Sequence, residues 1–463
     1  MKKLWQKNKE KLNPIIEAFE TKDDLLVDQK LLKFDVYGSI AHAKMLNKIG
    51  IISKKELSLI KRGLLEILEL GNNGKFILQA GDEDIHTKIE NYLTKEYGDA
   101  GKKIHTGRSR NDQVLTALRL FTKEELLFIW EDLFILIESF LNFAKKYEFT
   151  PMPGYTHMQK AMPSSVGMWA GSFVEGLLDD LDILKSVYSL INKSPLGSAA
   201  GYGVPLNIDR NYTSDLLGFK GLQINSLYSQ NSRGKLEAAV IALLNSILLD
   251  INKFSSDVLL FTTSEFGFFK VSDSLSSGSS IMPQKKNVDI AELLRSKIHL
   301  VLGYYTQVIS IASNLPSGYN RDLQDTKKAF IEALETTQDS LKVANILVNN
   351  LLPNQEKLEE VLTPDIFAVH NALKLVSKGT PFREAYKSVG ANISKIKLGS
   401  ELKFLLRNKN KYLKKSTHIG GTGNLCLEKY KEQLNKEKHI YKNEYKKFTV
   451  NLEILTAKEV KKY

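Results

Sequence analysis

Cysteine is almost absent from this chain of 463 residues, which contains only Cys426. A single cysteine excludes an intramolecular disulfide framework and any zinc cluster built on cysteines. Long apolar runs are also missing, since no uncharged run approaches the ~18 residues of a membrane span. The start, "MKKLWQKNKEKL", has lysines with no apolar stretch behind them, so it does not read as a signal peptide. These absences favour a cytoplasmic protein with no membrane partner.

Negative charge is scarce near the C-terminus. Residues 401–463 hold 16 Lys and Arg against 7 Asp and Glu, and this +9 is most of the net charge of +12. A basic segment of this kind could contact nucleic acid. Its lysines, however, alternate with Glu and Tyr in a helix-like pattern, and no zinc-finger spacing, RNA-binding signature or glycine-rich phosphate loop accompanies them. We interpret the segment as a solvated helical face, with no nucleic-acid partner.

Glycine and proline are few or absent in five long segments whose apolar residues recur at three- and four-residue spacing. These segments are 111–149, 166–193, 233–265, 288–313 and 325–351. The first would be about 58 Å long as one helix, and helices of that length pack as nearly parallel rods. The sequence therefore predicts an all-α protein with a long central helical bundle (106–353) and smaller helical N-terminal (1–105) and C-terminal (354–463) domains.

The breaks between these helices collect polar residues. They read "KKIHTGRSRND" (102–112), "TPMPGYTHMQKAMPSS" (150–165), "SPLGSAAGYGVP" (194–205), "GSSIMPQKKN" (278–287) and "NLPSGYNRDLQDTK" (314–327). Loops on a rigid scaffold often carry binding and catalytic groups. In the first break, Ser109 or Asn111 can cap the following helix, and Arg108 and Arg110 at its N-terminal end favour a carboxylate or phosphate. A capped helix with surface arginines explains this break equally well.

The loop 278–287 is the most informative of the five. A run of Ser and Gly suits a mobile flap that closes over a ligand. Lys285 and Asn287 could then hold an anionic substrate, while Ser279 or Ser280 reaches the reacting atom. A serine hydroxyl is a poor base unless nearby positive charge lowers its pKa, which explains why lysines share the loop. A flexible linker would leave the Ile-Met-Pro sequence unexplained.

Two further breaks carry candidate groups with open alternatives. His157 lies between prolines that stiffen its loop, and a histidine suits proton transfer near neutral pH, although a structural histidine would look the same. Thr156 adds a hydroxyl beside it. In the last break Tyr319, Gln324 and Lys327 could hold a polar ligand, because the last two share a face if a helix has already begun there. A solvated helix start is the alternative.

At this point the loops can be compared with known families. "GSSIMPQKKN" is similar to the signature loop of the fumarase/aspartase superfamily, whose members cleave C–N or C–O bonds to release fumarate. With "HTGRSRNDQV", "GYTHMQKAMP", "SPLGSAAGYGVPL" and "LPSGYNRDLQ", the chain resembles the argininosuccinate lyase family from about residue 30 to 390. The resemblance implies an all-α homotetramer whose active sites form where loops of three subunits meet. It also implies reversible cleavage of argininosuccinate to arginine and fumarate, without metal or organic cofactor.

The resemblance further implies roles for individual residues. Ser279 would be the base that takes the succinyl Cβ proton, and Lys285 with Asn287 would steady the aci-carboxylate that forms. His157 would take part in proton transfer, oriented by Glu292. Whether Ser279 or His157 is the base, with the other as the acid, stays open. The substrate-binding residues that the resemblance implies are Arg108, Ser109, Asn111, Thr156, Asn287, Tyr319, Gln324 and Lys327.

The chain departs from the family pattern in four places. Residues 6–8 read Gln-Lys-Asn where many members have Gly-Gly-Arg-Phe, and Asp24 aligns with a serine that helps to hold the arginine moiety. Val288 stands where a proline usually follows the signature loop, and "YSQNSRGKLE" (228–237) replaces a more acidic stretch while keeping Arg233. These departures concern mainly the N-terminal contacts, and no residue before 100 is assigned to the site.

Two other functions compete with this one. A lyase for another succinyl substrate, such as adenylosuccinate, usually carries Lys-Arg where Lys285 and Lys286 stand and lacks "GRSRND". A catalytically silent structural protein on the same scaffold is the second alternative, and the presence of both Ser279 and His157 argues against it.

Overall fold

The computed structural model describes residues 13–21, 24–79, 82–393 and 399–457, and the altered run at residues 6–8 lies outside them. The prediction of an all-α fold is confirmed. Each of the five predicted long segments forms a helix whose ends lie within four residues of the predicted ones. These helices are α6 (Arg110–Lys146), α7 (Val166–Ile191), α10 (Lys235–Phe261), α11 (Asp289–Ala312) and α12 (Thr326–Asn349).

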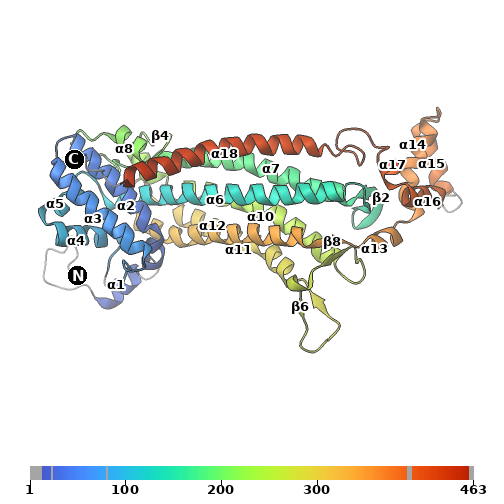
Figure 1. Cartoon of the computed structure of the whole chain (residues 1–463), viewed down its shortest axis with the longest axis horizontal. Coiled ribbons are helices and arrows are strands. Elements are labelled where there is room, and N and C mark those ends of the chain that lie inside the picture. Colours follow the sequence, from blue (N-terminus) through green and yellow to red (C-terminus); the bar gives the residue numbers. More distant parts are fainter. Residues whose placement is uncertain (1–12, 22–23, 80–81, 394–398, 458–463) are drawn as a thin grey trace.

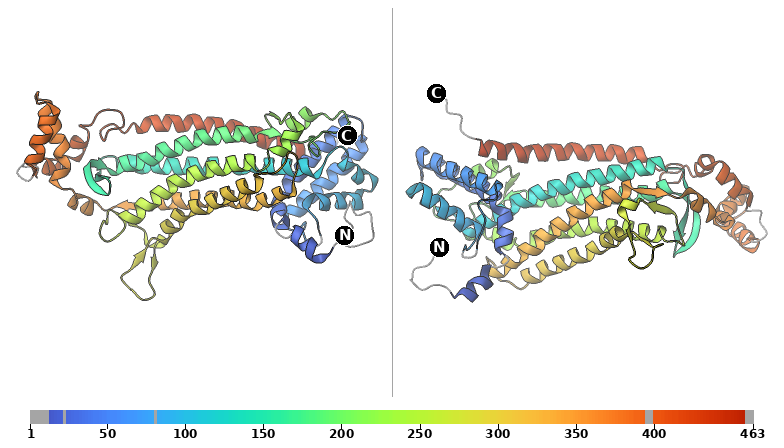
Figure 2. Two further views of the ribbon diagram at one scale, coloured as in Figure 1. Left: turned by 180° about the vertical axis from the view of Figure 1, so that it is seen from behind. Right: turned by 60° about the horizontal axis from the view of Figure 1, so that its bottom comes forward.

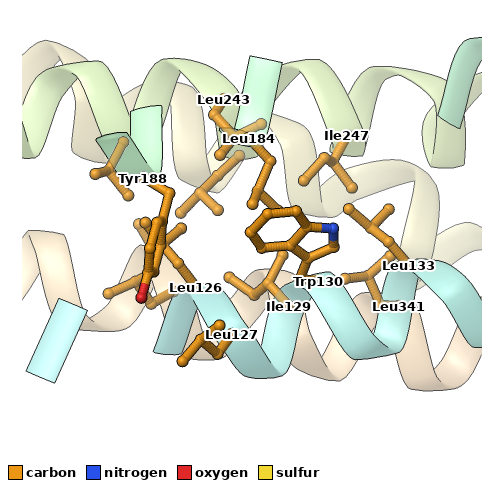
Figure 3. Close-up of a cluster of buried hydrophobic side chains, with 14 of the residues drawn as sticks. Leu126, Leu127, Ile129, Trp130, Leu133, Leu184, Tyr188, Leu243, Ile247 and Leu341 are labelled. Carbon is orange, nitrogen blue, oxygen red and sulfur yellow. The ribbon is translucent and has the colours of Figure 1, made fainter. Parts of the chain in front are cut away.

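The five helices lie side by side as an elongated bundle, and the C-terminal helix α18 (Leu427–Thr456) runs along it (Figures 1 and 2). Apolar side chains fill the space between them. Trp130 of α6 lies at the centre of one part of this core, between Tyr188 of α7 and Ile247 of α10 (Figure 3). Burial of such large side chains contributes about 1.5–3 kcal/mol each, so the long apolar stripes hold the bundle together.

Helix α10 is both long and strongly apolar. Among the described residues, it is the one helix whose length and composition would allow it to cross a membrane, and 56% of its most apolar stretch is buried inside the molecule. Its neighbours there are α7, α11 and α12. That environment is typical of the core helix of a bundle.

The helices of the chain's N-terminal part pack at one end of the bundle (Figure 1). They are α1 (Pro14–Thr21), α2 (Asp24–Lys48), α3 (Lys54–Asn72), α4 (Ile85–Tyr97), α5 (Asp99–Lys102) and the 3₁₀ helix η1 (Lys103–His105). Local sequence sets where two of them begin. Ser53 and Glu56 form a capping box on α3, and the Asp84 side chain accepts a hydrogen bond from the backbone N–H of Thr87 on α4.

In the described part of the chain, four small two-stranded sheets connect the helices, where the sequence had indicated only irregular breaks. The largest is an antiparallel hairpin of β1 (Pro151–Thr156) and β2 (Gln159–Ser165). The others pair β3 (Lys193–Ser194) with β4 (Gly221–Leu222), β5 (Phe269–Val271) with β8 (Leu351–Pro353), and β6 (Ser277–Gly278) with β7 (Lys286–Asn287). Short helical turns lie between them: α8 (Arg210–Leu216), α9 (Ser226–Asn231), η2 (Asp273–Leu275) and η3 (Arg321–Asp325).

The C-terminal part, expected as one small domain from residue 354, has two parts in the structure. The first contains α13 (Gln355–Glu360), η4 (Pro364–Phe367), α14 (Ala368–Val376), α15 (Phe382–Ala391), α16 (Gly399–Arg407) and α17 (Lys409–Leu413). It has two small apolar clusters of its own beyond the other end of the bundle (Figure 1). The second part, α18, instead packs on α6 and α7 and reaches α2 and α8 at the N-terminal end.

Candidate active site

A cavity of about 220 Å³ lies at the N-terminal end of the bundle, and it is unusually rich in charge. Four of the predicted substrate-binding residues line it together: Asn111, Tyr319, Gln324 and Lys327. They come from the start of α6, the loop before α12, η3 and the first turn of α12. The remaining lining residues are Glu20, Asp24, Asp28, Glu83, Asp84, Arg110, Val114, Arg233 and Arg321.

The segment "GRSRND" forms the start of α6 beside this cavity. Ser109, rather than Asn111, is the N-cap, and Asp112 completes a capping box with it. The second carboxylate oxygen of Asp112 accepts hydrogen bonds of 3.0 Å from the backbone N–H groups of Gly197 and Ala199. Burial raises the pKa of Asp112, while these N–H groups act to lower it. The capping box thus joins two of the predicted loops and fixes Asn111 at the cavity.

Arg108 does not line the cavity, although its motif suggested a substrate contact. Its side chain is buried in the N-terminal helices, where Nη1 donates a hydrogen bond of 2.9 Å to Ser39 Oγ. Gly107 before it has φ of +76°, which glycine adopts without strain. Arg108 therefore holds the loop that precedes α6 against α2.

Most cations of the cavity are already paired with carboxylates. Arg110 contacts Glu83 at 2.5 Å and Asp84 at 3.4 Å. Arg321 lies 3.3 Å from Glu20, whose backbone carbonyl also accepts a hydrogen bond of 2.8 Å from Gln324 Nε2. These pairs join α1 and α4 to the bundle, so the cavity is enclosed by contacts between segments that are far apart in the sequence.

Lys327 is the most buried cation in this arrangement. Its Nζ atom lies 2.8 Å from Oδ1 of Asp24 and 2.8 Å from Oδ1 of Asp28, both on α2. Burial acts to lower the pKa of Lys327, but the two carboxylates raise it, so the ammonium group stays charged. Burial raises the pKa of Asp24 to about 6, and Lys327 offsets part of this rise.

Arg233 differs from the other cations of the cavity. Its guanidinium group lies over the ring of Tyr319, 4.7 Å from the ring centre. The side chain is buried, and its Nη1 atom has no hydrogen-bond partner among the described residues. Burial lowers its pKa. The guanidinium group interacts with Tyr319 and Glu237, but its Nη1 atom can still donate a hydrogen bond to a ligand carboxylate.

The predicted flap 278–287 projects from the side of the bundle as the β6–β7 hairpin (Figure 1). Ser279 Oγ accepts hydrogen bonds from the backbone N–H groups of Ile281 (3.3 Å) and Met282 (3.0 Å). Two N–H donors stabilise negative charge on that oxygen, and they favour the alkoxide that a serine base requires. Lys285 is exposed in the same loop, and Asn287 pairs with Ser277 at its base.

Thr156 and His157 lie at the tip of the β1–β2 hairpin, at the far end of the bundle from the charged cavity (Figures 1 and 2). The turn places His157 and Met158 at φ of +52° and +60°, a strained backbone for residues other than glycine. Both side chains are exposed. Glu292 is exposed in the first turn of α11, near the base of the flap.

Within one chain ten of the twelve predicted site residues thus occupy three separate places, while Arg108 and Ser109 hold the start of α6. The cavity holds four of them, the flap and the start of α11 hold Ser279, Lys285, Asn287 and Glu292, and the hairpin tip holds Thr156 and His157. Sequence reasoning did not assign the other charged lining residues to the site. Arg110 and Arg321 lie within the quoted loops, and Arg233 and Asp24 had been noted as well, so these four left a signal. The other acidic lining residues left none beyond their charge.

Comparison with known proteins shows which class of protein this chain belongs to. A family described as Lyase matches residues 8–303, and the chain belongs to this family. Among solved structures, EDDS lyase in complex with formate has a TM-score of 0.80 at 22% identity, covering 97% of this chain and 95% of that one. A class II fumarase from Schistosoma mansoni has a TM-score of 0.67 at 20% identity, covering 81% and 91%. Identity this low shows the shared fold alone.

Curated relatives show which group of lyases the chain resembles in sequence. Argininosuccinate lyase of Thermotoga neapolitana is 43% identical over 387 residues, which are 84% of this chain and 97% of the relative. Argininosuccinate lyase of Bacteroides thetaiotaomicron is 42% identical over 424 residues, covering 92% and 93%. Within the lyase family, this chain is therefore a member of the argininosuccinate lyases.

Proposed function

We propose that this chain cleaves argininosuccinate reversibly to arginine and fumarate. The observation that carries the proposal is the near full-length similarity to argininosuccinate lyases at more than 40% identity. The grouping of Asn111, Tyr319, Gln324 and Lys327 around one charged cavity supports it, because these residues had been assigned to substrate binding. A substrate with carboxylate and cationic groups suits a cavity that presents both signs of charge.

In the proposed reaction, Ser279 takes the proton from the succinyl Cβ. The two backbone N–H groups on its Oγ support this role, since they stabilise the alkoxide. The electrons of the broken C–H bond move into the adjacent carboxylate, and Lys285 with Asn287 steadies the dianion. As this intermediate collapses, the C–N bond breaks and the guanidino nitrogen leaves with a proton. His157, oriented by Glu292, supplies that proton, and the step uses no metal or organic cofactor.

The substrate assignment is tested by incubating the purified chain with argininosuccinate, and separately with adenylosuccinate, and following fumarate by its ultraviolet absorbance. We expect fumarate from argininosuccinate alone. Fumarate from adenylosuccinate alone would overturn the substrate assignment but keep the chemistry. If a well-folded protein released no fumarate from either substrate, the result would favour the alternative of a catalytically silent structural protein.

We further propose that the protein works as a homotetramer whose active sites combine residues of different subunits. Two observations support this. The cavity lies at the N-terminal end of the bundle, whereas the flap projects from its side and the β1–β2 hairpin lies at its other end (Figure 1), so the loops of one chain do not meet in one site. Large apolar side chains are also exposed on each of the five bundle helices, Phe128 of α6 and Ile346 of α12 among them, as a subunit interface would require. They include Ile183, Leu190, Leu249, Leu293, Leu300 and Leu302.

Mixing two inactive variants tests this assembly. Ser279→Ala removes a flap residue and Asn111→Ala a cavity residue, so a mixed tetramer contains some sites in which both native residues meet. Random mixing should restore about one quarter of the wild-type activity per site if the two residues come from different chains. The mass in solution should be four times the 52.3 kDa of one chain. No recovery in tetramers proven to be mixed would place both residues on the same chain.

A further inference from the structure

The hairpin that carries His157 makes its turn with two residues, and neither of them is glycine. Thr156 pairs with Gln159 across the hairpin, so His157 and Met158 are the two central residues of the turn. Both have positive φ, at +52° and +60°, as in the type I′ turn that usually contains Asn-Gly. A side chain at such a position costs free energy, and the conformation persists only where surrounding contacts fix it.

Few packed neighbours fix this turn, because two cavities border the hairpin. One cavity, of about 580 Å³, is lined by the turn and by residues of the segments 265–268 and 361–365. The second, of about 320 Å³, is lined by Thr156 of the hairpin and by His370 and His418 of the C-terminal part. A cavity offers no partner atoms on its open side, so the turn depends on the side chains that reach a neighbouring segment.

Tyr155 and Lys160 are two such residues. They face each other across the hairpin, one pair away from the turn, so their side chains lie on the same face. The ring centre of Tyr155 lies 6.0 Å from that of Phe266 and 6.4 Å from that of Phe268, in the aromatic segment that follows α10. The Nζ atom of Lys160 donates a hydrogen bond of 2.6 Å to the backbone carbonyl of Val361, at the C-terminal end of α13. Each strand of the hairpin is thus anchored to a different segment.

We propose that Lys160 and Tyr155 are positioning residues, which hold the strained turn in the conformation that presents His157 to the substrate. This inference rests on the proposed function, in which His157 supplies a proton to the leaving nitrogen. It also gives the C-terminal part a task in catalysis, since Val361 of that part anchors the hairpin next to its turn. A catalytic group displaced by about 1 Å can lose about 10²-fold in rate, so contacts that do not reach the substrate can control kcat.

The first test measures kcat and KM of Lys160→Met, which keeps the length of the side chain and removes its hydrogen-bond donor. We expect kcat to fall about tenfold and KM to change less than about twofold, because the residues of the charged cavity are untouched. Lys160→Arg keeps a donor and should retain most of the activity. Lys357→Met is the matched control, because Lys357 is a lysine of α13 whose ion pair with Glu360 stays within that helix.

Relief of the strained turn separates positioning from any other role of Lys160. Met158→Gly relieves the strain, because glycine adopts positive φ freely and the Met158 side chain is 65% exposed. Adding it to Lys160→Met should restore most of the lost kcat, since the turn then no longer depends on the contact with Val361. Tyr155→Leu should behave like Lys160→Met, and Tyr155→Phe, which keeps the ring, should behave like the wild type.

Hydrogen exchange of residues 155–160, followed by mass spectrometry, reports on the turn without turnover. We expect faster exchange in Lys160→Met than in the wild type, and slower exchange again once Met158→Gly is added. Unchanged exchange, a native kcat in Lys160→Met, or a loss of kcat that Met158→Gly does not reverse would each overturn the inference. The proposed function fails separately, when the wild type releases no fumarate from argininosuccinate. In that case the exchange experiment still decides whether Lys160 and Tyr155 hold the turn.

Discussion

Replacing Ser279 with alanine should lower kcat about 10³-fold while leaving the oligomeric state of the protein and its thermal stability unchanged. The size follows from the loss of general-base catalysis, which typically contributes 10²–10⁴-fold. The fold should survive because Ser279 lies in a mostly exposed loop, and within the described residues its Oγ accepts hydrogen bonds from the backbone N–H groups of Ile281 and Met282 alone. Fumarate release under saturating argininosuccinate gives kcat, and light scattering gives the assembly state.

Ser280→Ala is the matched control, because Ser280 is the neighbouring hydroxyl in the same exposed loop. The sequence alone left open which of the two serines reaches the reacting atom. In the structure, Ser279 Oγ is the one that accepts two backbone N–H groups, so Ser280→Ala should keep most of the activity. A near-native rate for Ser279→Ala would rule this residue out as the base.

The second large effect is expected on stability. Lys327→Met should lower the free energy of unfolding by about 3–5 kcal/mol, because it leaves Asp24 and Asp28 as buried carboxylates without their cation. Substrate affinity should fall as well, since the same side chain lines the cavity. Chemical denaturation followed by circular dichroism, at one protein concentration for all variants, measures the change.

Lys30→Met is the control for Lys327→Met. Lys30 forms an ion pair with Glu335, but both side chains are more than 40% exposed, and a pair of this kind contributes at most about 1 kcal/mol. Adding Asp28→Asn to Lys327→Met should restore part of the stability, because it removes one of the two carboxylates that the loss of Lys327 leaves without a cation. If Lys327→Met proves as stable as Lys30→Met, the buried cluster does not hold α2 to α12.

The sequence was most informative where structure depends on residues close together. The apolar spacing of 111–149 predicted α6 within a few residues, because helical periodicity and capping are properties of a short segment. The choice between Ser109 and Asn111 as the N-cap needed the structure, since either side chain can accept a backbone N–H group two or three residues after it. The four small sheets were not predicted, because their strands of two to seven residues carry too little alternation to be distinguished from loops.

The candidate site was predicted only in part. Resemblance to a family supplied Ser279, His157 and the residues of the cavity, but it gave no reason to group some of them and separate others. The acidic lining residues were missed, because a carboxylate in an amphipathic helix is indistinguishable in sequence from a solvated one. Asp24 had been noted only as a departure from the family pattern. In the structure its carboxylate forms an ion pair with Lys327 at the cavity.

The sequence by itself therefore determined the long helices, the family and the chemical groups available for catalysis, since each depends on residue type and local spacing. Tertiary structure alone decided that Asp28 meets Lys327, 299 residues away, and that α18 returns along the bundle. It also decided that the flap and the hairpin lie apart from the cavity (Figure 1). Contacts of this kind depend on how whole helices pack against one another, and no short stretch of sequence records that packing.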